Sequence, residues 1–159
     1  MFSHILLPTD GSPASESAVH ACIQMARELG ASITAMHVMP VLHIFTYEPG
    51  VTESVHEQVK RERERHSQKY LELVEQRAAA AGVACHTVLV TSDYPYEAII
   101  DTARTRHCDL IAMASHGRRG VKGMLIGSET QRVLTHSAIP VLVYRNGASP
   151  AGIHATFLS

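Results

Sequence analysis

Four glycines lie between an apolar run that predicts a strand and a helical pattern that begins at Ser128. They are Gly117, Gly120, Gly123 and Gly127. Glycine has no Cβ, so its backbone approaches a ligand closely and adopts positive φ angles. A helix that begins directly after such a loop offers unpaired N–H groups and the positive end of its dipole. This arrangement at the end of a strand favours an anion-binding loop, and the alternative is a mobile, glycine-rich surface connection.

The side chains of the same stretch suit a phosphate. Ser115, Ser128 and Thr130 carry hydroxyls, and Arg118 and Arg119 carry positive charge. The stretch is not a Walker A loop, because that motif has a lysine directly before the hydroxyl residue, whereas a glycine precedes Ser128 here. The G-x-G-x-x-G pattern of dinucleotide-binding proteins is absent as well. The loop is therefore predicted to hold an anion largely through its backbone.

Asp10 lies in a second polar segment, "PTDGS", which follows the first apolar run. A general base would need a partner group beside it, and no second carboxylate is near in sequence. Hydrogen bonding to a ribose or base is the favoured interpretation, and capping of the following helix near Ser12 is compatible with it. His116 is expected to order the glycine loop or contact a phosphate, because no nucleophile stands beside it.

These segments must be positioned by strands and helices that alternate along the chain. Such alternation predicts a parallel sheet with helices on both faces. Ligands of these sheets bind beyond the carboxyl ends of the strands, where the strand order reverses. If the first and fourth strands are neighbours, the two polar loops face each other. The expected strands span residues 4–10, 32–40, 84–90, 109–114 and 140–145, and the expected helices span 11–30, 51–81, 94–107 and 128–136.

Helix ends carry recognisable signals. Ser12 suits an N-cap, with Pro13 in the first turn, and Gly30 suits the end of the same helix. Ser128 and Gln131 form an S-x-x-Q pattern that predicts a capping box at the last helix.

Composition narrows the classes of function. The chain has 159 residues, a formal net charge of −1 and 18% charged residues, so it gives no argument for nucleic acid or an anionic membrane surface. No apolar run approaches the length of a transmembrane helix, and the start of the chain does not resemble a secretory signal, so a cytoplasmic location is expected. The three cysteines are scattered, which favours reduced, buried thiols. The eleven histidines form no local metal-binding pair, although a site assembled from distant histidines stays open.

The segment "LIAMASHGRRGVKGMLIGSETQRVLTHSAIPVLVYR" closely resembles the C-terminal half of the universal stress protein family. "ILLPTDGS" near the start and "MHV" in the second strand extend the resemblance through Arg145. The nucleotide-binding members carry G-x2-G-x9-G-[ST], and Gly117 and Gly127-Ser128 match it, whereas Ala114 replaces the first glycine.

The resemblance implies a five-stranded parallel sheet of order 3-2-1-4-5 with a Rossmann-like, adenine nucleotide alpha hydrolase-like fold. It implies one domain over residues 1–146, with 147–159 as a flexible tail, and a homodimer through Val141–Tyr144. It also implies binding of ATP, or of AMP or ADP, with Mg²⁺ as an accompanying ion. The adenosine would lie near Pro8, Thr9, Asp10 and Val38, with Met113 and Ala114 on the ribose side. The ribose and phosphates would be lined by His116, Gly117, Arg119, Gly127, Ser128, Glu129 and Thr130.

Two residues depart from the family pattern. Ala114 adds a methyl group where the motif has none, so weakened or altered nucleotide binding is expected. Asp93 stands where the family usually has a glycine before the third helix, and it is interpreted as a turn residue.

Three functions follow as hypotheses. The first is an adenine-nucleotide-binding stress-response or signalling dimer. The second is a slow ATP hydrolase of the same fold, although no complete set of catalytic residues is visible. The third is a nucleotide-free interaction module. A response-regulator receiver is disfavoured, because Asp10 stands alone where a pair of acids is needed and Arg145 replaces the lysine.

Overall fold

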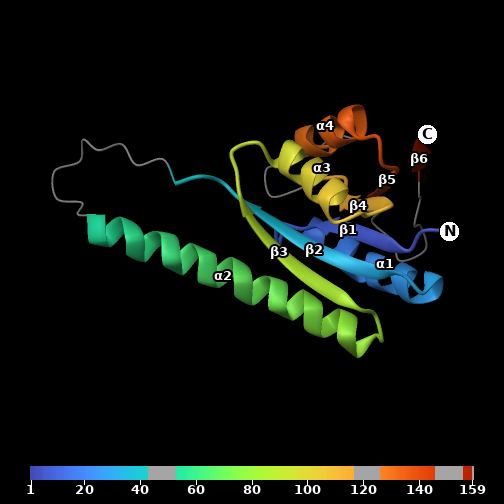
Figure 1. The fold of residues 1–159 in the computed structure, drawn as a ribbon, viewed down its shortest axis with the longest axis horizontal. Coiled ribbons are helices and arrows are strands. Elements are labelled where there is room, and N and C mark those ends of the chain that lie inside the picture. The colour runs from blue at the N-terminus through green and yellow to red at the C-terminus, as the bar shows by residue number, and fades with distance from the viewer. Residues whose placement is uncertain (43–52, 117–125, 146–155, 159) are drawn as a thin grey trace.

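The computed structural model describes residues 1–42, 53–116, 126–145 and 156–158. Five parallel strands form a sheet in the order 3-2-1-4-5, as predicted, and a short sixth strand lies beyond the fifth (Figure 1). The strands are β1 (His4–Pro8), β2 (Ser32–Met39), β3 (Cys85–Thr91), β4 (Leu110–Ala114), β5 (Val141–Tyr144) and β6 (Thr156–Leu158). The helices are α1 (Pro13–Leu29), α2 (Glu53–Ala80), α3 (Pro95–Thr105) and α4 (Ser128–His136).

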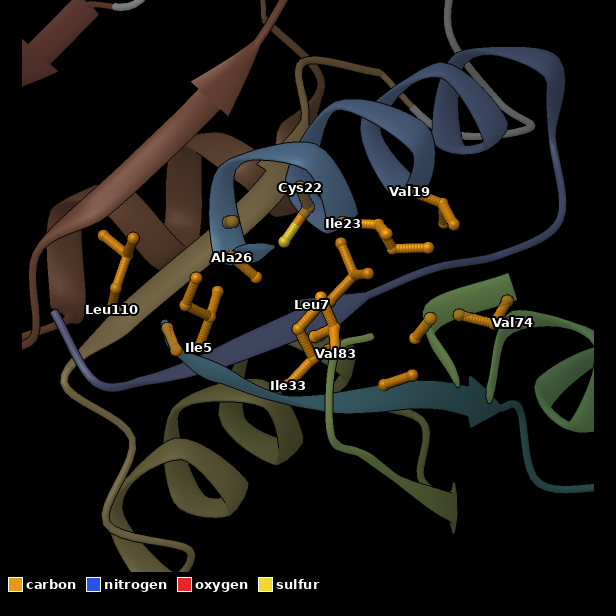
Figure 2. Close-up of a cluster of buried hydrophobic side chains, with 14 of the residues drawn as sticks. Ile5, Leu7, Val19, Cys22, Ile23, Ala26, Ile33, Val74, Val83 and Leu110 are labelled. Atoms are coloured by element: carbon orange, nitrogen blue, oxygen red, sulfur yellow. The ribbon is translucent and has the colours of Figure 1, made fainter. Parts of the chain in front are cut away.

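Side chains of the central strands alternate between two hydrophobic cores. In β1, Ile5 and Leu7 pack in the core beneath α1 and α2, whereas Leu6 packs in the core beneath α3 and α4. All three are fully buried, because the sheet is covered on both faces. Figure 2 shows the first of these cores, where Cys22 and Val74 approach the sheet from the two helices.

The ends of α1 agree with the sequence prediction. The Ser12 side chain accepts a hydrogen bond from the Ser15 N–H at 3.2 Å, and Pro13 is the first residue of the helix. Gly30 ends the helix at φ 65°, a left-handed conformation that glycine adopts without steric cost.

The capping box predicted at α4 is wrong. Gly127 is the N-cap, Ser128 is the first helical residue, and no side chain caps the helix. The reason is the close approach of the chain to β4. A Cβ placed on Gly127 would lie 3.2 Å from the Ser115 carbonyl oxygen, so the N-cap position favours glycine over serine.

The tail of the chain contributes β6, which sequence analysis did not expect. Thr156–Leu158 pairs antiparallel with β5, and Leu142 lies opposite Phe157. The predicted flexibility of the rest of the tail concerns residues 147–155 and 159, which lie outside the described residues.

The three cysteines are free, as their scattered positions predicted. Cys22 and Cys108 are buried, and Cys85 is half-buried. Burial raises the pKa of the Cys22 thiol to about 12. Among the described residues, no helix is both long and apolar enough to span a membrane, and no three potential metal ligands cluster together.

Candidate functional site

The candidate site lies at the carboxyl ends of β1 and β4, the position at which sheets of this topology bind ligands, and is called the crevice below. The two strands pair only at Ile5–Leu110 and Leu6–Ile111. Beyond this point β1 continues alongside β2 as far as Pro8, while β4 continues alongside β5. The strand order therefore reverses here, and the loops after β1 and β4 flank the opening, as the alternation predicted.

Thr9 is the most constrained residue of the first loop. Its N–H donates to the Met36 carbonyl oxygen at 2.8 Å, and its own carbonyl oxygen lies 2.7 Å from His37 Nδ1. Its hydroxyl contacts the hydroxyls of Ser15 and Tyr70, the latter at 2.9 Å. Because Thr9 is only 6% exposed, these contacts fix both its main chain and its side chain at the start of the loop.

Asp10 shapes the turn that leads into α1. Its Oδ1 accepts a hydrogen bond from the Ser12 N–H at 2.9 Å, and its own N–H donates to Ser15 Oγ at 3.1 Å. Gly11, between them, has φ 73°. The capping interpretation of Asp10 is therefore confirmed, and its contact with a ribose or base stays a prediction.

A polar network that sequence analysis missed connects this loop to α2. Tyr70 donates to Glu16 Oε1 at 2.5 Å, and Arg77 donates to Glu16 Oε2 at 2.5 Å. Since the Tyr70 proton is directed to Glu16, the tyrosine oxygen accepts from Thr9. Sequence analysis placed Tyr70 only within the expected helix 51–81, and no local pattern reveals partners this far apart along the chain.

The hydrogen bonds of this network shift the pKa values of Glu16 and Tyr70. Partial burial opposes ionisation of Glu16, but hydrogen bonds from Tyr70 and Arg77 outweigh it and lower the glutamate pKa. Burial and the hydrogen bond to Glu16 raise the pKa of Tyr70 to about 12. The network therefore persists as a carboxylate, a neutral phenol and a guanidinium at neutral pH.

The end of β4 holds the first turn of α4. The Gly127 N–H donates to the Ser115 carbonyl oxygen at 2.6 Å, and Thr130 Oγ1 donates to the Ala114 carbonyl oxygen at 3.0 Å. The Ser115 N–H is in turn bound to the Tyr144 carbonyl oxygen at 2.8 Å. These contacts place the N-terminus of α4 at the crevice, where its first N–H groups have no partner within the helix.

Two predicted ligand residues of α4 have different surroundings. Ser128 is exposed at the helix start. The Glu129 carboxylate accepts a hydrogen bond from the Tyr96 N–H at 3.0 Å and another from Arg132 at 3.2 Å. Glu129 thus stabilises the N-terminus of α3, whose own N-cap residue supplies no side-chain bond. A ligand contact of Ser128 or Glu129 stays a prediction.

The remaining predicted residues surround the same opening. Pro8 and Val38 are half-buried at the ends of β1 and β2, and Met113 and Ala114, 6% and 9% exposed, end β4. His116 Nδ1 lies 3.0 Å from Ser115 Oγ, so a hydroxyl does stand beside this histidine, contrary to the sequence analysis, and its loop-ordering role stays a prediction. Gly117 and Arg119 lie outside the described residues.

Asp93 is a turn residue, as interpreted from the sequence. Its Oδ1 accepts a hydrogen bond from the Val41 N–H at 3.0 Å. The contact ties the segment after β2 to the segment after β3.

Solved structures share this fold. The structure of protein MJ0577, from Methanocaldococcus jannaschii, is 26% identical, with a TM-score of 0.80, over 94% of this chain and 99% of that one. A universal stress protein in complex with cAMP is 23% identical, with a TM-score of 0.65, over 91% and 97% of the two chains. An Arabidopsis thaliana member of that family with AMP bound is 15% identical, with a TM-score of 0.66, over 97% and 99%. At their identities, the last two show similarity of fold alone.

Similarity of sequence is more specific. The universal stress protein MJ0531 of Methanocaldococcus jannaschii is 32% identical over 146 residues, which are 91% of this chain and 83% of that protein. The universal stress protein YxiE of Bacillus subtilis is 30% identical over 91% of this chain and its own whole length. The model of the universal stress protein family matches residues 1–145. The chain therefore belongs to the universal stress protein family.

Proposed function

We propose that the protein binds an adenine nucleotide, ATP or else AMP or ADP, in the crevice between β1 and β4. The observation that carries this proposal is the attachment of α4 to the end of β4. The Gly127 and Thr130 hydrogen bonds hold the N-terminus of α4 at the end of β4, and the N–H groups of the first helical turn have no acceptor within the helix itself. A helix N-terminus attracts anions through these N–H groups and its dipole. The family relationship, and the cAMP and AMP in two proteins of this fold, support the same class of ligand.

The two sides of the crevice suit different parts of a nucleotide. Thr9 and Asp10, with Val38 at the end of β2, are assigned to the adenosine. Gly127 and Ser128 are assigned to the phosphates, together with the backbone of Thr130, because the Thr130 hydroxyl is already bound to Ala114. This division follows the family pattern and agrees with the position of each residue around the opening.

Mg²⁺ would accompany a bound triphosphate. The described residues include no cluster of three potential metal ligands. Mg²⁺ commonly retains several waters and binds substrate phosphates, so the ion would arrive with the nucleotide and need few protein ligands.

The biological unit is proposed to be a cytoplasmic homodimer that signals stress through its nucleotide state. The contact between copies would use the edge of the sheet at Val141–Tyr144. This assignment rests on the family resemblance alone, because β6 pairs with the outer edge of β5 in the structure.

Nucleotide retention tests the proposal. The full chain would be purified without added nucleotide and denatured, and the released small molecules identified by mass spectrometry. Calorimetry with ATP-Mg²⁺, ADP and AMP would follow on the stripped protein. Gly127→Val is expected to abolish binding by crowding Ser115 and the helix start, whereas Thr135→Val, on the exposed face of the same helix, leaves it unchanged.

A preparation that retains no nucleotide and gives no heat with any of the three would overturn the proposal. ATP turnover that is lost in Asp10→Ala or His116→Ala would instead assign the protein to slow hydrolases of this fold.

A further inference from the structure

The outer edge of β5 presents backbone groups that need a partner. The carbonyl oxygens of Pro140 and Tyr144 accept hydrogen bonds from β4, at 2.9 Å from Ile111 N and 2.8 Å from Ser115 N. Backbone groups of successive strand residues point to opposite sides. Val141 and Val143 therefore direct their N–H and C=O groups away from β4, to the outer edge.

The C-terminal strand lies along this outer edge. β6 is antiparallel to β5, with Leu158 opposite Val141 and Thr156 opposite Val143 (Figure 1). These are the two β5 residues whose backbone groups face outward. In an antiparallel ladder, opposed residues of this kind exchange both backbone hydrogen bonds. The register of β6 thus brings Thr156 and Leu158 opposite the β5 residues whose N–H and C=O groups do not pair with β4.

We propose that residues 156–158, which pair with the outer edge of β5, exclude a second copy of the chain from that edge. A strand has two edges, and β4 covers the other one. A dimer contact through Val141–Tyr144 would need the same N–H and C=O groups that β6 covers. The competition rests on the proposed dimer, whereas occupation of the edge by the tail does not.

The tail suits a displaceable occupant. β6 is three residues long, shorter than most strands, so it holds the edge weakly. It is tethered to β5 through the chain between residues 145 and 156, so its pairing is intramolecular and independent of protein concentration. Association of two copies grows with concentration. The tail is therefore expected to occupy the edge in dilute protein, and a second copy to displace it in concentrated protein.

Hydrogen exchange of the full chain tests occupation of the edge. Thr156→Pro removes the N–H opposite Val143, whereas Thr156→Ala retains it and serves as the matched control. In dilute protein, the proline variant is expected to exchange the Val141 and Val143 amides about fivefold faster or more. The Leu142 amide faces β4 and should not change. Equal exchange of the Val141 and Val143 amides in all variants in dilute protein would overturn the proposal.

Light scattering over a range of concentrations tests the competition. The Thr156→Pro chain, and a chain that ends at Arg145, are expected to dimerise at concentrations about tenfold lower or more than the unmodified chain. If all three associate equally although the β5 amides are exposed, the competition is wrong. Nucleotide retention of the same samples is read separately, so loss of the proposed ligand site would not be mistaken for failure of the tail to bind.

Discussion

Tyr70 connects α2 to the loop that follows β1, and Tyr70→Phe removes only the oxygen that makes the connection. The substitution deletes the hydrogen bonds to Thr9 and Glu16 and keeps the ring. Neither partner is left alone, since Thr9 retains Ser15 and Glu16 retains Arg77. The change is therefore a loss of two hydrogen bonds without a newly orphaned buried group.

The expected loss of unfolding free energy is about 1–2 kcal/mol. A hydrogen bond to a charged group contributes roughly 1.5–3 kcal/mol when it is well shielded, and a neutral one contributes about 1 kcal/mol. The side chains of Glu16 and Arg77 are 33% and 52% exposed, so water replaces part of the lost interaction and the lower end of the range applies.

Urea unfolding followed by circular dichroism measures this loss, and a double-mutant cycle with Glu16→Gln isolates the coupling of Tyr70 to the carboxylate. We expect a coupling of about 1 kcal/mol at pH 7. The folded-state pKa of Glu16 is lowered, so the ionised glutamate adds to the free energy of unfolding above its unfolded pKa of about 4.3. This addition is lost as the pH falls below that value. Tyr94→Phe, at an exposed tyrosine, is the control. A coupling within about 0.3 kcal/mol of zero at pH 7 would refute the network as a link between α1 and α2.

Two further substitutions test the supports of β4. Thr130→Val removes the donor to the buried Ala114 carbonyl and is expected to cost about 1–2 kcal/mol, whereas Thr135→Val costs less than about 0.5 kcal/mol; chemical denaturation of both variants checks this. Asp109 accepts from the Ser3 N–H and hydroxyl and from the His4 N–H, and these bonds outweigh partial burial and lower its pKa. The ionised Asp109 therefore adds to the free energy of unfolding above its unfolded pKa of about 3.9, and this addition is lost as the pH falls. Acid titration of Asp109→Asn should show a shallower loss of unfolding free energy than the unmodified chain. Equal slopes of the two titrations would contradict this.

The elements and their alternation could be predicted because each element carries its own local signal, whereas the strand order 3-2-1-4-5 was implied by the family resemblance. Apolar runs identified the buried strands, and Ser12 and Gly30 identified the ends of α1 through local hydrogen bonding and backbone conformation. The position of the crevice followed from the alternation of strands and helices. These features depend on neighbours a few residues apart, which a single sequence contains.

The contacts between distant elements could not be predicted in this way. Glu129 was expected to line the ribose and phosphates, which stays a prediction, but the contact of its carboxylate with the Tyr96 N–H of another helix was not expected. Tyr70 was only one residue of the expected helix 51–81, and its hydroxyl donates to Glu16 on α1. The capping box failed for a related reason, because the contact of Gly127 with β4 decides where the helix begins. Each partner lies across the fold, where residue spacing carries no information.

The family motif has a glycine at positions 114 and 127, but the fold of this chain favours glycine only at position 127. At Gly127 a Cβ would press against the Ser115 carbonyl oxygen, so the fold itself favours glycine there. Ala114 is an ordinary strand residue, paired with Tyr144, and its carbonyl oxygen is bound by Thr130. A Cβ at 114 therefore suits the strand, and a glycine there would serve close approach of a ligand. The strength of nucleotide retention by the unmodified chain thus measures how much space the ligand needs beside the end of β4, separately from the stability of the fold.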